Sequence, residues 1–259
     1  MAEKAILIDT SKCIACKGCQ IACKQWNELT AGKPEFFAST DGYENPSDLS
    51  YHTFNLIRFH LPQKEENEDP EWLFRKWQCM HCTDAACVTN CTTLGYNAAQ
   101  KDPATGFVFV DRDKCVGCQS CFNGIPEQGL PGCPFGIPRY AIAEDLPDDV
   151  DPGKMYKCWG CLDRQTNGEE PACVKTCAPD AAVYGDRDVL VAQAQARKIE
   201  LEAAGKTVYL YGIDELGGLH YIYVLLREPS FYGLPSPEEL SARTRRASLR
   251  YLLKKVSSF

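Results

Sequence analysis

The chain carries sixteen cysteines among 259 residues, and their spacing is the strongest chemical signal in the sequence. They fall into four groups of four with none left over: Cys13, Cys16, Cys19, Cys23; Cys79, Cys82, Cys87, Cys91; Cys115, Cys118, Cys121, Cys133; and Cys158, Cys161, Cys173, Cys177. Thiolates bind metals, act as nucleophiles or pair as disulfides. A chemistry that uses cysteines in fours is therefore the one to look for.

Three alternatives compete with a redox centre. Disulfides suit short secreted chains, whereas this chain is long and most of its cysteines stand only two residues from another, which is poor for pairwise crosslinking. Structural zinc typically takes two separated cysteine pairs, which the fourth group matches and the first does not. Buried free thiols leave the fourfold regularity unexplained.

The first group has the spacing C-x2-C-x2-C-x3-C, which is typical of bacterial iron–sulfur proteins. A cuboidal cluster has its irons at separate corners, so three thiolates of one tight loop wrap it while the fourth comes from elsewhere in the chain. Four cysteines per cluster predict four 4Fe–4S clusters, with all sixteen cysteines as iron ligands. The grouping alone does not say which groups share clusters.

An internal repeat relates the groups to one another. Residues 6–16 (ILIDTSKCIAC) align with residues 108–118 (VFVDRDKCVGC), and residues 86–91 (ACVTNC) match residues 172–177 (ACVKTC). The first two stretches each begin with a short strand-like apolar run that an Asp closes before the cysteine loop. The pattern predicts a tandem duplication, in which one structural unit is used twice.

With these motifs, residues 4–235 resemble the four-cluster iron–sulfur subunits of molybdenum or tungsten bis-pterin oxidoreductases. Within that family the chain is most similar to the beta subunit of formate dehydrogenase, through residues 19–29 (CQIACKQWNEL), 72–82 (WLFRKWQCMHC) and 217–225 (GGLHYIYVL), with YGLP at 232–235.

The resemblance implies an electron-transfer subunit with no catalysis of its own. It would carry electrons between a catalytic subunit that holds the molybdenum or tungsten pterin cofactor and a downstream acceptor, such as a cytochrome or a quinone-linked subunit. The alternatives are the equivalent subunit of a sulfur-oxyanion, polysulfide or sulfoxide reductase and, from another class, a zinc-organised scaffold.

The resemblance also implies how the cysteines pair. Cluster one takes Cys13, Cys16, Cys19 and Cys177; cluster two takes Cys23, Cys158, Cys161 and Cys173; cluster three takes Cys79, Cys82, Cys87 and Cys133; cluster four takes Cys91, Cys115, Cys118 and Cys121. In the family, cluster one lies nearest the catalytic subunit and cluster four nearest the electron exit. Eleven residues separate Cys121 from Cys133 where the usual run has three, and this Gly- and Pro-rich insertion indicates a loop.

The fold class that the resemblance implies is α+β, with two ferredoxin-like units of the bacterial two-cluster type, one inserted in the other. Residues 1–34 and 141–186 form the first unit with clusters one and two, and residues 35–140 form the inserted unit with clusters three and four. Residues 187–259 form an α/β C-terminal extension. It contains a helix over 189–204 that ends at Gly205, two strands over 208–212 and 219–226, and a terminal basic helix.

The terminal helix is predicted to begin at a Ser236–Glu239 capping box. Six Lys or Arg residues and no acidic residue follow over 241–259. We interpret this segment as a surface helix, with docking to a partner or an anionic membrane surface as the alternative. His81 lies inside a cysteine loop, and the hypothesis is that its ring hydrogen-bonds sulfur and tunes a reduction potential.

Charge and hydropathy restrict the partners and the location. The formal charge of −7 and the pI of about 5.2 argue against a nucleic-acid partner, since such proteins usually show a basic footprint. The longest apolar run, over 221–226, is far too short to span a membrane, and charged residues interrupt the N-terminus where a signal peptide is apolar. The resemblance implies a periplasmic subunit that is exported together with a signal-bearing catalytic subunit; the alternative is the cytoplasm.

Overall fold

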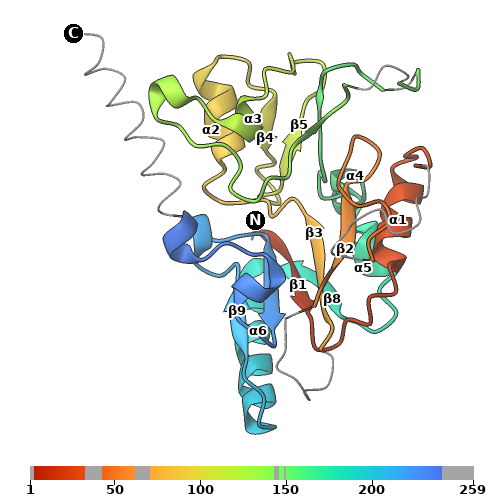
Figure 1. Ribbon diagram of the computed structural model, residues 1–259, viewed down its shortest axis with the longest axis vertical. Coiled ribbons are helices and arrows are strands. Elements are labelled where there is room, and N and C mark those ends of the chain that lie inside the picture. Colours follow the sequence, from red (N-terminus) through yellow and green to blue (C-terminus); the bar gives the residue numbers. More distant parts are fainter. Residues whose placement is uncertain (1–2, 33–42, 62–70, 143–145, 149, 241–259) are drawn as a thin grey trace.

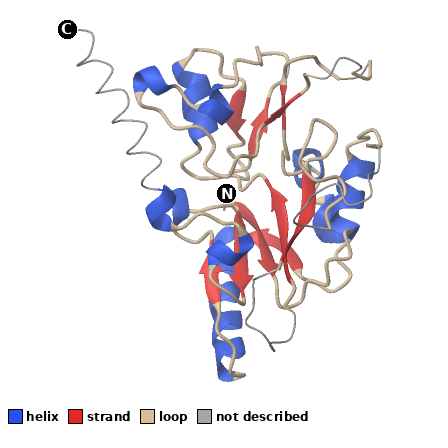
Figure 2. Ribbon diagram, in the orientation of Figure 1, coloured by secondary structure: helices blue, strands red, loops and turns tan. Residues whose placement is uncertain are grey.

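The computed structural model describes residues 3–32, 43–61, 71–142, 146–148 and 150–240. Within these ranges the chain forms a four-stranded sheet, three two-stranded pairs and a set of mostly short helices joined by long loops (Figures 1 and 2). This mixture of strands and helices is the α+β class expected from the sequence. None of the helices in these ranges is long and apolar enough to cross a membrane.

The four-stranded sheet joins the two ends of the described chain. Its strand order is β8 (Ala182–Asp186), β1 (Lys4–Asp9), β10 (Tyr221–Leu225) and β9 (Tyr209–Tyr211). The central strands β1 and β10 run parallel, and the outer strands are antiparallel to them. Both central strands are covered on both faces, which explains why their sequences are nearly continuous apolar runs.

The two faces of this sheet pack against different parts of the chain, because side chains alternate between the faces along a strand. One face packs on the long helix α6 (Arg187–Ala203) through Ala5, Leu7, Ile222 and Val224. The opposite face packs on the segments that carry cysteines, through Ile6, Ile8, Tyr221 and Tyr223. The sheet therefore anchors the cysteine-rich part of the chain on one side and α6 on the other.

The cysteine-rich part divides into two regions in Figure 1. Beside the sheet lie the hairpin β2 (Asn55–His60) and β3 (Leu73–Gln78) and the helices α1 (Gly18–Trp26), α4 (Leu162–Thr166) and α5 (Ala172–Lys175). Above them lie α2 (Ala86–Thr93), α3 (Ser120–Asn123) and the paired strands β4 (Ala99–Lys101) and β5 (Val108–Val110). The pair β6 (Arg139–Tyr140) and β7 (Met155–Tyr156) follows, and 3-10 turns occupy Pro126–Gln128, Glu215–Gly217 and Pro229–Tyr232. Helix α1 packs on α5, and α2 packs on α3.

The elements predicted after residue 187 form largely as expected. The helix is α6, and Gly205 follows its last turn in the left-handed conformation (φ 78°), which suits glycine because it has no Cβ. The two strands are β9 and β10. The Ser236 hydroxyl accepts a hydrogen bond from the Glu239 N–H (3.2 Å), so the capping box forms. The basic segment over 241–259 lies outside the described residues.

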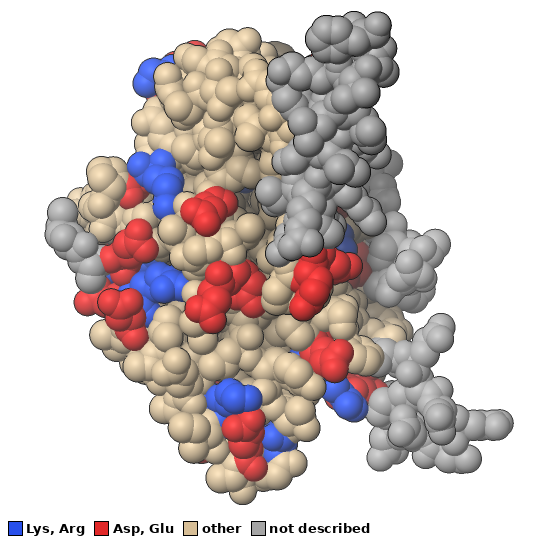
Figure 3. Space-filling model, turned by 90° about the vertical axis from the view of Figure 1, so that its left-hand side faces the viewer, with Lys and Arg blue, Asp and Glu red and all other residues tan. Residues whose placement is uncertain are grey.

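The described surface mixes charges of both signs. On the face in Figure 3, acidic and basic side chains alternate over the middle and lower parts, and the upper part of that face carries few charges. The described part of this face therefore shows no continuous basic stripe.

Candidate metal centres

The first thiol set forms where β1 leads into α1. Ala15 and Lys17 adopt positive φ angles (54° and 61°), which curl the loop before the helix begins. Cys13 lies beside Cys16 and Cys177, and Cys19 lies near Cys173 as well as Cys13 and Cys177. These proximities agree with the first ligand set that the resemblance implies, called set one here, which consists of Cys13, Cys16, Cys19 and Cys177.

The second set combines one cysteine of the first sequence group with three cysteines of the fourth. Cys19 and Cys23 stand one turn apart on α1, and Cys173 lies on α5, which packs against α1. Cys23 is buried beside Cys158, Cys173 and Cys161. One end of the helix pair therefore belongs to set one and the other end to set two, which consists of Cys23, Cys158, Cys161 and Cys173.

The third set depends on the inserted loop after Cys121. The loop closes on itself through a bridge between Ile125 and Leu130. The N–H of Cys133 then donates to the carbonyl of Cys121 at 2.9 Å, so the chain returns to its starting point. This return delivers Cys133 to the neighbourhood of Cys82. Set three consists of Cys79, Cys82, Cys87 and Cys133.

The fourth set lines a single cavity, whose walls include Cys91, Cys115, Cys118 and Cys121. The backbone N–H groups of Ala98 and Ala99 point at Cys91 Sγ, at 3.2 and 3.4 Å. Tyr140 Oη lies 3.2 Å from Cys121 Sγ. Such donors favour a thiolate over a thiol, because only the charged sulfur is a good acceptor.

Burial makes several of these thiols poor acids on their own. It raises the pKa of Cys19 and of Cys161 to about 12, and that of Cys121 to about 11, and neighbouring thiols add to each rise. Metal ligands must be deprotonated, so four crowded thiolates need positive charge between them. All-sulfur donor sets suit iron–sulfur clusters, and the residues present fit that group. Within the described residues, no three His, Cys, Asp or Glu side chains converge as they do on a single metal ion.

Four cations are buried in the described part of the chain, and sequence reasoning missed all four. One of them, Arg164, pairs with Glu169 at 2.8 Å. Arg75, Lys76 and Lys157 are at most 7% exposed, and none has a carboxylate within ion-pair distance among the described residues. Burial alone lowers the pKa of Lys76, but the neighbouring thiols, of which Cys173 is the strongest influence, outweigh it and hold that pKa above its ordinary value.

His81 is fully buried and its ring orientation is fixed. The Val108 N–H donates to His81 Nδ1 at 2.9 Å, so the ring proton of the neutral imidazole sits on Nε2. Burial, followed by the charge of Lys157, lowers the pKa of His81 and keeps the ring neutral. The ring stacks near Phe107 and Tyr221, and its Nε2 has no partner among the described residues. An N–H donor between Cys79 and Cys82 of set three is therefore left without an acceptor in the described part of the chain.

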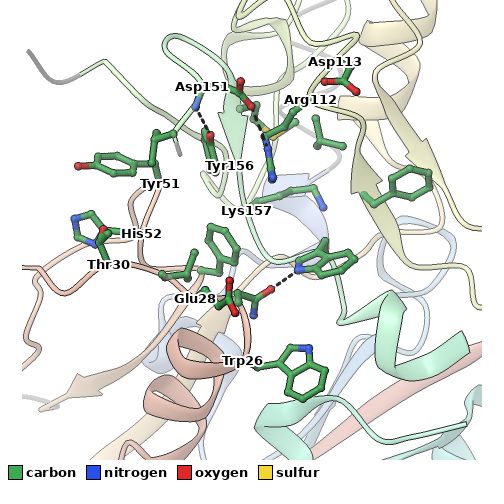
Figure 4. Close-up of a pocket in the computed structure, with 18 residues that line it drawn as sticks. Trp26, Glu28, Thr30, Tyr51, His52, Arg112, Asp113, Asp151, Tyr156 and Lys157 are labelled. Atoms are coloured by element: carbon green, nitrogen blue, oxygen red, sulfur yellow. Dashed lines mark hydrogen bonds and ion pairs between the residues drawn. The ribbon is translucent and has the colours of Figure 1, made fainter. Parts of the chain in front are cut away.

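A separate cavity lies between the C-terminal end of α1, the segment before β2 and the strands β5 and β7 (Figure 4). Arg112 pairs with Asp151 at 3.5 Å and lies over the Tyr156 ring, 5.0 Å from its centroid. Lys157 and Trp159 also line this cavity. None of the sixteen thiols lines it, so it is no part of the four sets.

Comparison with known proteins places these thiol sets in a family. Residues 12–94 and 70–187 each match a family described as a 4Fe-4S dicluster domain. The chain is 37% identical over 243 residues to the nitrate-inducible formate dehydrogenase iron-sulfur subunit of Escherichia coli (strain K12), covering 92% of this chain and 74% of that protein. It is 34% identical to formate dehydrogenase subunit beta of Megalodesulfovibrio gigas, covering 89% and 97%.

A third relative is formate dehydrogenase 2 subunit beta (cytochrome c-553) of Nitratidesulfovibrio vulgaris, 31% identical over 88% of this chain and 96% of that protein. The matched domains confirm the prediction of iron–sulfur clusters over the zinc alternative. The chain therefore belongs to the family of formate dehydrogenase iron–sulfur subunits, which are built from ferredoxin-type 4Fe–4S domains.

Proposed function

We propose that this chain conducts electrons through four 4Fe–4S clusters between a formate-oxidising catalytic subunit and a downstream acceptor. The observation that carries the proposal is the gathering of sixteen thiols into four sets of four in a chain of this family. When bound, each cluster gives or accepts one electron at a time. The chain itself holds the thiols in place, covers all of them except Cys16 and Cys118 at least partly, and sets their electrostatic surroundings.

Each thiol set is proposed to hold one cluster, and the proximities above support this assignment. Set one (Cys13, Cys16, Cys19, Cys177) holds cluster one and set two (Cys23, Cys158, Cys161, Cys173) holds cluster two. Set three (Cys79, Cys82, Cys87, Cys133) holds cluster three and set four (Cys91, Cys115, Cys118, Cys121) holds cluster four.

The proposed domain arrangement is one ferredoxin-like unit inserted in another. Residues 1–34 and 141–186 form the outer unit, residues 35–140 the inserted unit, and residues 187–259 the extension. Two pairings between distant segments support the outer unit, since β1 pairs with β8 and α1 packs on α5. The packing of α2 on α3 supports the inserted unit. The extension shares the sheet of the outer unit through β10.

The proposed partners are a catalytic subunit with a molybdenum or tungsten bis-pterin cofactor and an acceptor such as a cytochrome or quinone-linked subunit. The exposure of Cys16 in set one and of Cys118 in set four supports electron entry and exit at these two sets. Ile14 and Val116 occupy equivalent places in the repeat and are 65% and 59% exposed, as contact residues would be. A periplasmic location through co-export is proposed from the resemblance alone, and cell fractionation distinguishes it from the cytoplasm.

The test of this function is formate-dependent bleaching. In the native complex, purified anaerobically through this chain, added formate is expected to bleach the visible absorption of the clusters rapidly, because the catalytic partner passes electrons into them. Dithionite is the control. Bleaching by dithionite but not by formate would assign the chain to another oxidoreductase complex, and a colourless protein without iron or acid-labile sulfide would end the electron-transfer proposal.

His81→Phe is expected to lower the reduction potential of the cluster nearest the ring. The substitution keeps the aromatic packing against Phe107 but removes the Nε2–H donor. A hydrogen bond to a charged acceptor contributes about 1.5 kcal/mol, and it favours the more negative, reduced state. Redox titration followed by electron paramagnetic resonance measures the change. Four unchanged midpoint potentials at full iron content would show that the ring only fills space.

A further inference from the structure

Lys76 is a buried charge without a carboxylate. It lies on β3, paired in register with Ile57, and its side chain is 3% exposed. None of the described carboxylates lies within ion-pair distance of its Nζ. Burying an unpaired ammonium costs several kcal/mol, so a stable fold needs another source of negative charge beside it.

The negative charge that Lys76 faces is sulfur. The thiols that interact with its ammonium belong to set one and set two: Cys173, Cys19, Cys158 and Cys23. Three of these four are ligands of the proposed cluster two. The other buried cations of the described residues point elsewhere: Arg75 Nε donates to the Tyr232 carbonyl, Lys157 Nζ donates to the Val108 and Cys158 carbonyls, and Arg164 pairs with Glu169. Lys76 is thus the buried cation placed between the first two sets.

Tyr221 links this charge to a sulfur atom. Lys76 Nζ lies 3.4 Å from Tyr221 Oη and 4.9 Å from the centroid of its ring. Tyr221 Oη in turn lies 4.0 Å from Cys173 Sγ. An ammonium only donates, so the tyrosine oxygen accepts from Lys76, and its own hydrogen is left for Cys173, which as a thiolate only accepts. The three groups form a chain of donors that ends on a ligand of set two.

We propose that Lys76 and Tyr221 raise the reduction potential of cluster two, and to a smaller extent that of cluster one, which makes them tuning residues at the entry of the electron path. The inference rests on the ligand sets proposed above. Reduction adds one electron and moves no proton. Four thiolates make the bound cluster negative and reduction makes it more so, and a nearby fixed cation favours the reduced state.

The test uses the native complex and redox titration followed by electron paramagnetic resonance. Lys76→Met, which removes the charge and keeps an unbranched side chain of similar length, is expected to lower the reduced-to-oxidised ratio of one cluster at least tenfold at fixed potential. A tenfold change corresponds to about 59 mV for one electron. Tyr221→Phe, which keeps the charge, is expected to give a smaller shift in the same direction, and Lys76→Arg little shift. Lys198→Met removes an equal charge from the surface of α6 as the control.

Each outcome decides the proposal. Support requires a shift that is largest for one cluster, that decreases from Lys76→Met through Tyr221→Phe to Lys76→Arg, and that is absent in the Lys198→Met control. Unchanged potentials, or an equal shift of all clusters, would overturn it. If the Lys76→Met complex contains less iron than the unaltered complex, Lys76→Arg must restore the iron content. If neither Lys76 variant assembles its clusters and Tyr221→Phe leaves all potentials unchanged, the proposal is also overturned. If the wild-type complex contains fewer than four clusters that dithionite reduces, the proposed function itself is refuted.

Discussion

Cys13→Ala and Cys177→Ala are expected to lose the same cluster, although these residues come from opposite ends of the cysteine-bearing chain. Both thiols belong to set one, because the loop before α1 meets the end of α5. Each variant should retain about twelve irons per chain where the unaltered subunit holds about sixteen, since each cluster contains four. The same paramagnetic signal should disappear from both. Formate-driven reduction of the downstream acceptor should fall by orders of magnitude if this cluster is the entry point.

A second pair of variants makes the pairing test decisive. Cys23→Ala and Cys173→Ala are expected to remove the same paramagnetic signal, because both thiols belong to set two. This signal should differ from the one that Cys13→Ala and Cys177→Ala remove. An uncrossed arrangement predicts instead that Cys13 groups with Cys23, and Cys173 with Cys177. Iron analysis and spectra of the four variants separate the two arrangements. Matching losses within the uncrossed pairs would refute the proposed ligand sets.

The chemistry of the chain could be predicted from the sequence because cysteine spacing is local. The C-x2-C-x2-C run that leads into α1 commits three thiolates to one centre whatever the rest of the chain does. The sharing of ligand sets between the first and fourth cysteine groups is not local. It depends on α1 packing against α5, and these helices are more than a hundred residues apart. Only the resemblance to a known family supplied that pairing.

The buried cations could not be predicted for a related reason. Residues 72–78 (WLFRKWQ) alternate imperfectly, and nothing in their pattern says that Arg75 and Lys76 are both buried. The burial of Lys76 is explained only when β10 brings Tyr221 and the thiols of set two bring negative charge to the same place. The role of β10 was also hidden, since a sequence pattern predicts a strand but not that it lies parallel to β1 in one sheet.

Removal of iron is expected to unfold the cysteine-rich segments and to leave the four-stranded sheet with α6 comparatively intact. Three of the four apolar cores contain cysteine side chains, whereas the core between the sheet and α6 contains none. The elements around the thiols are short: β4, β5, β6 and β7 have two or three residues, and α3, α4 and α5 have four or five. Strands and helices of this length are not stable alone.

Hydrogen exchange measures this segmental unfolding. The iron is removed anaerobically with a chelator, and the protection is then measured for each peptide of the chain. Protection should fall to that of unfolded chain around α1, α2, α3 and α5, while α6 and β10 keep part of theirs. Leu190, 2% exposed in the cysteine-free core, supplies a matched test, because Leu190→Ala costs about 2–5 kcal/mol and should abolish the remaining protection. Uniform retention of protection without iron would mean that the thiol sets are shaped by the polypeptide alone. Loss of protection in the cysteine-rich segments alone would mean instead that the bound clusters fold the segments that surround them. A change at Lys76 would then act on cluster assembly as well as on reduction potential.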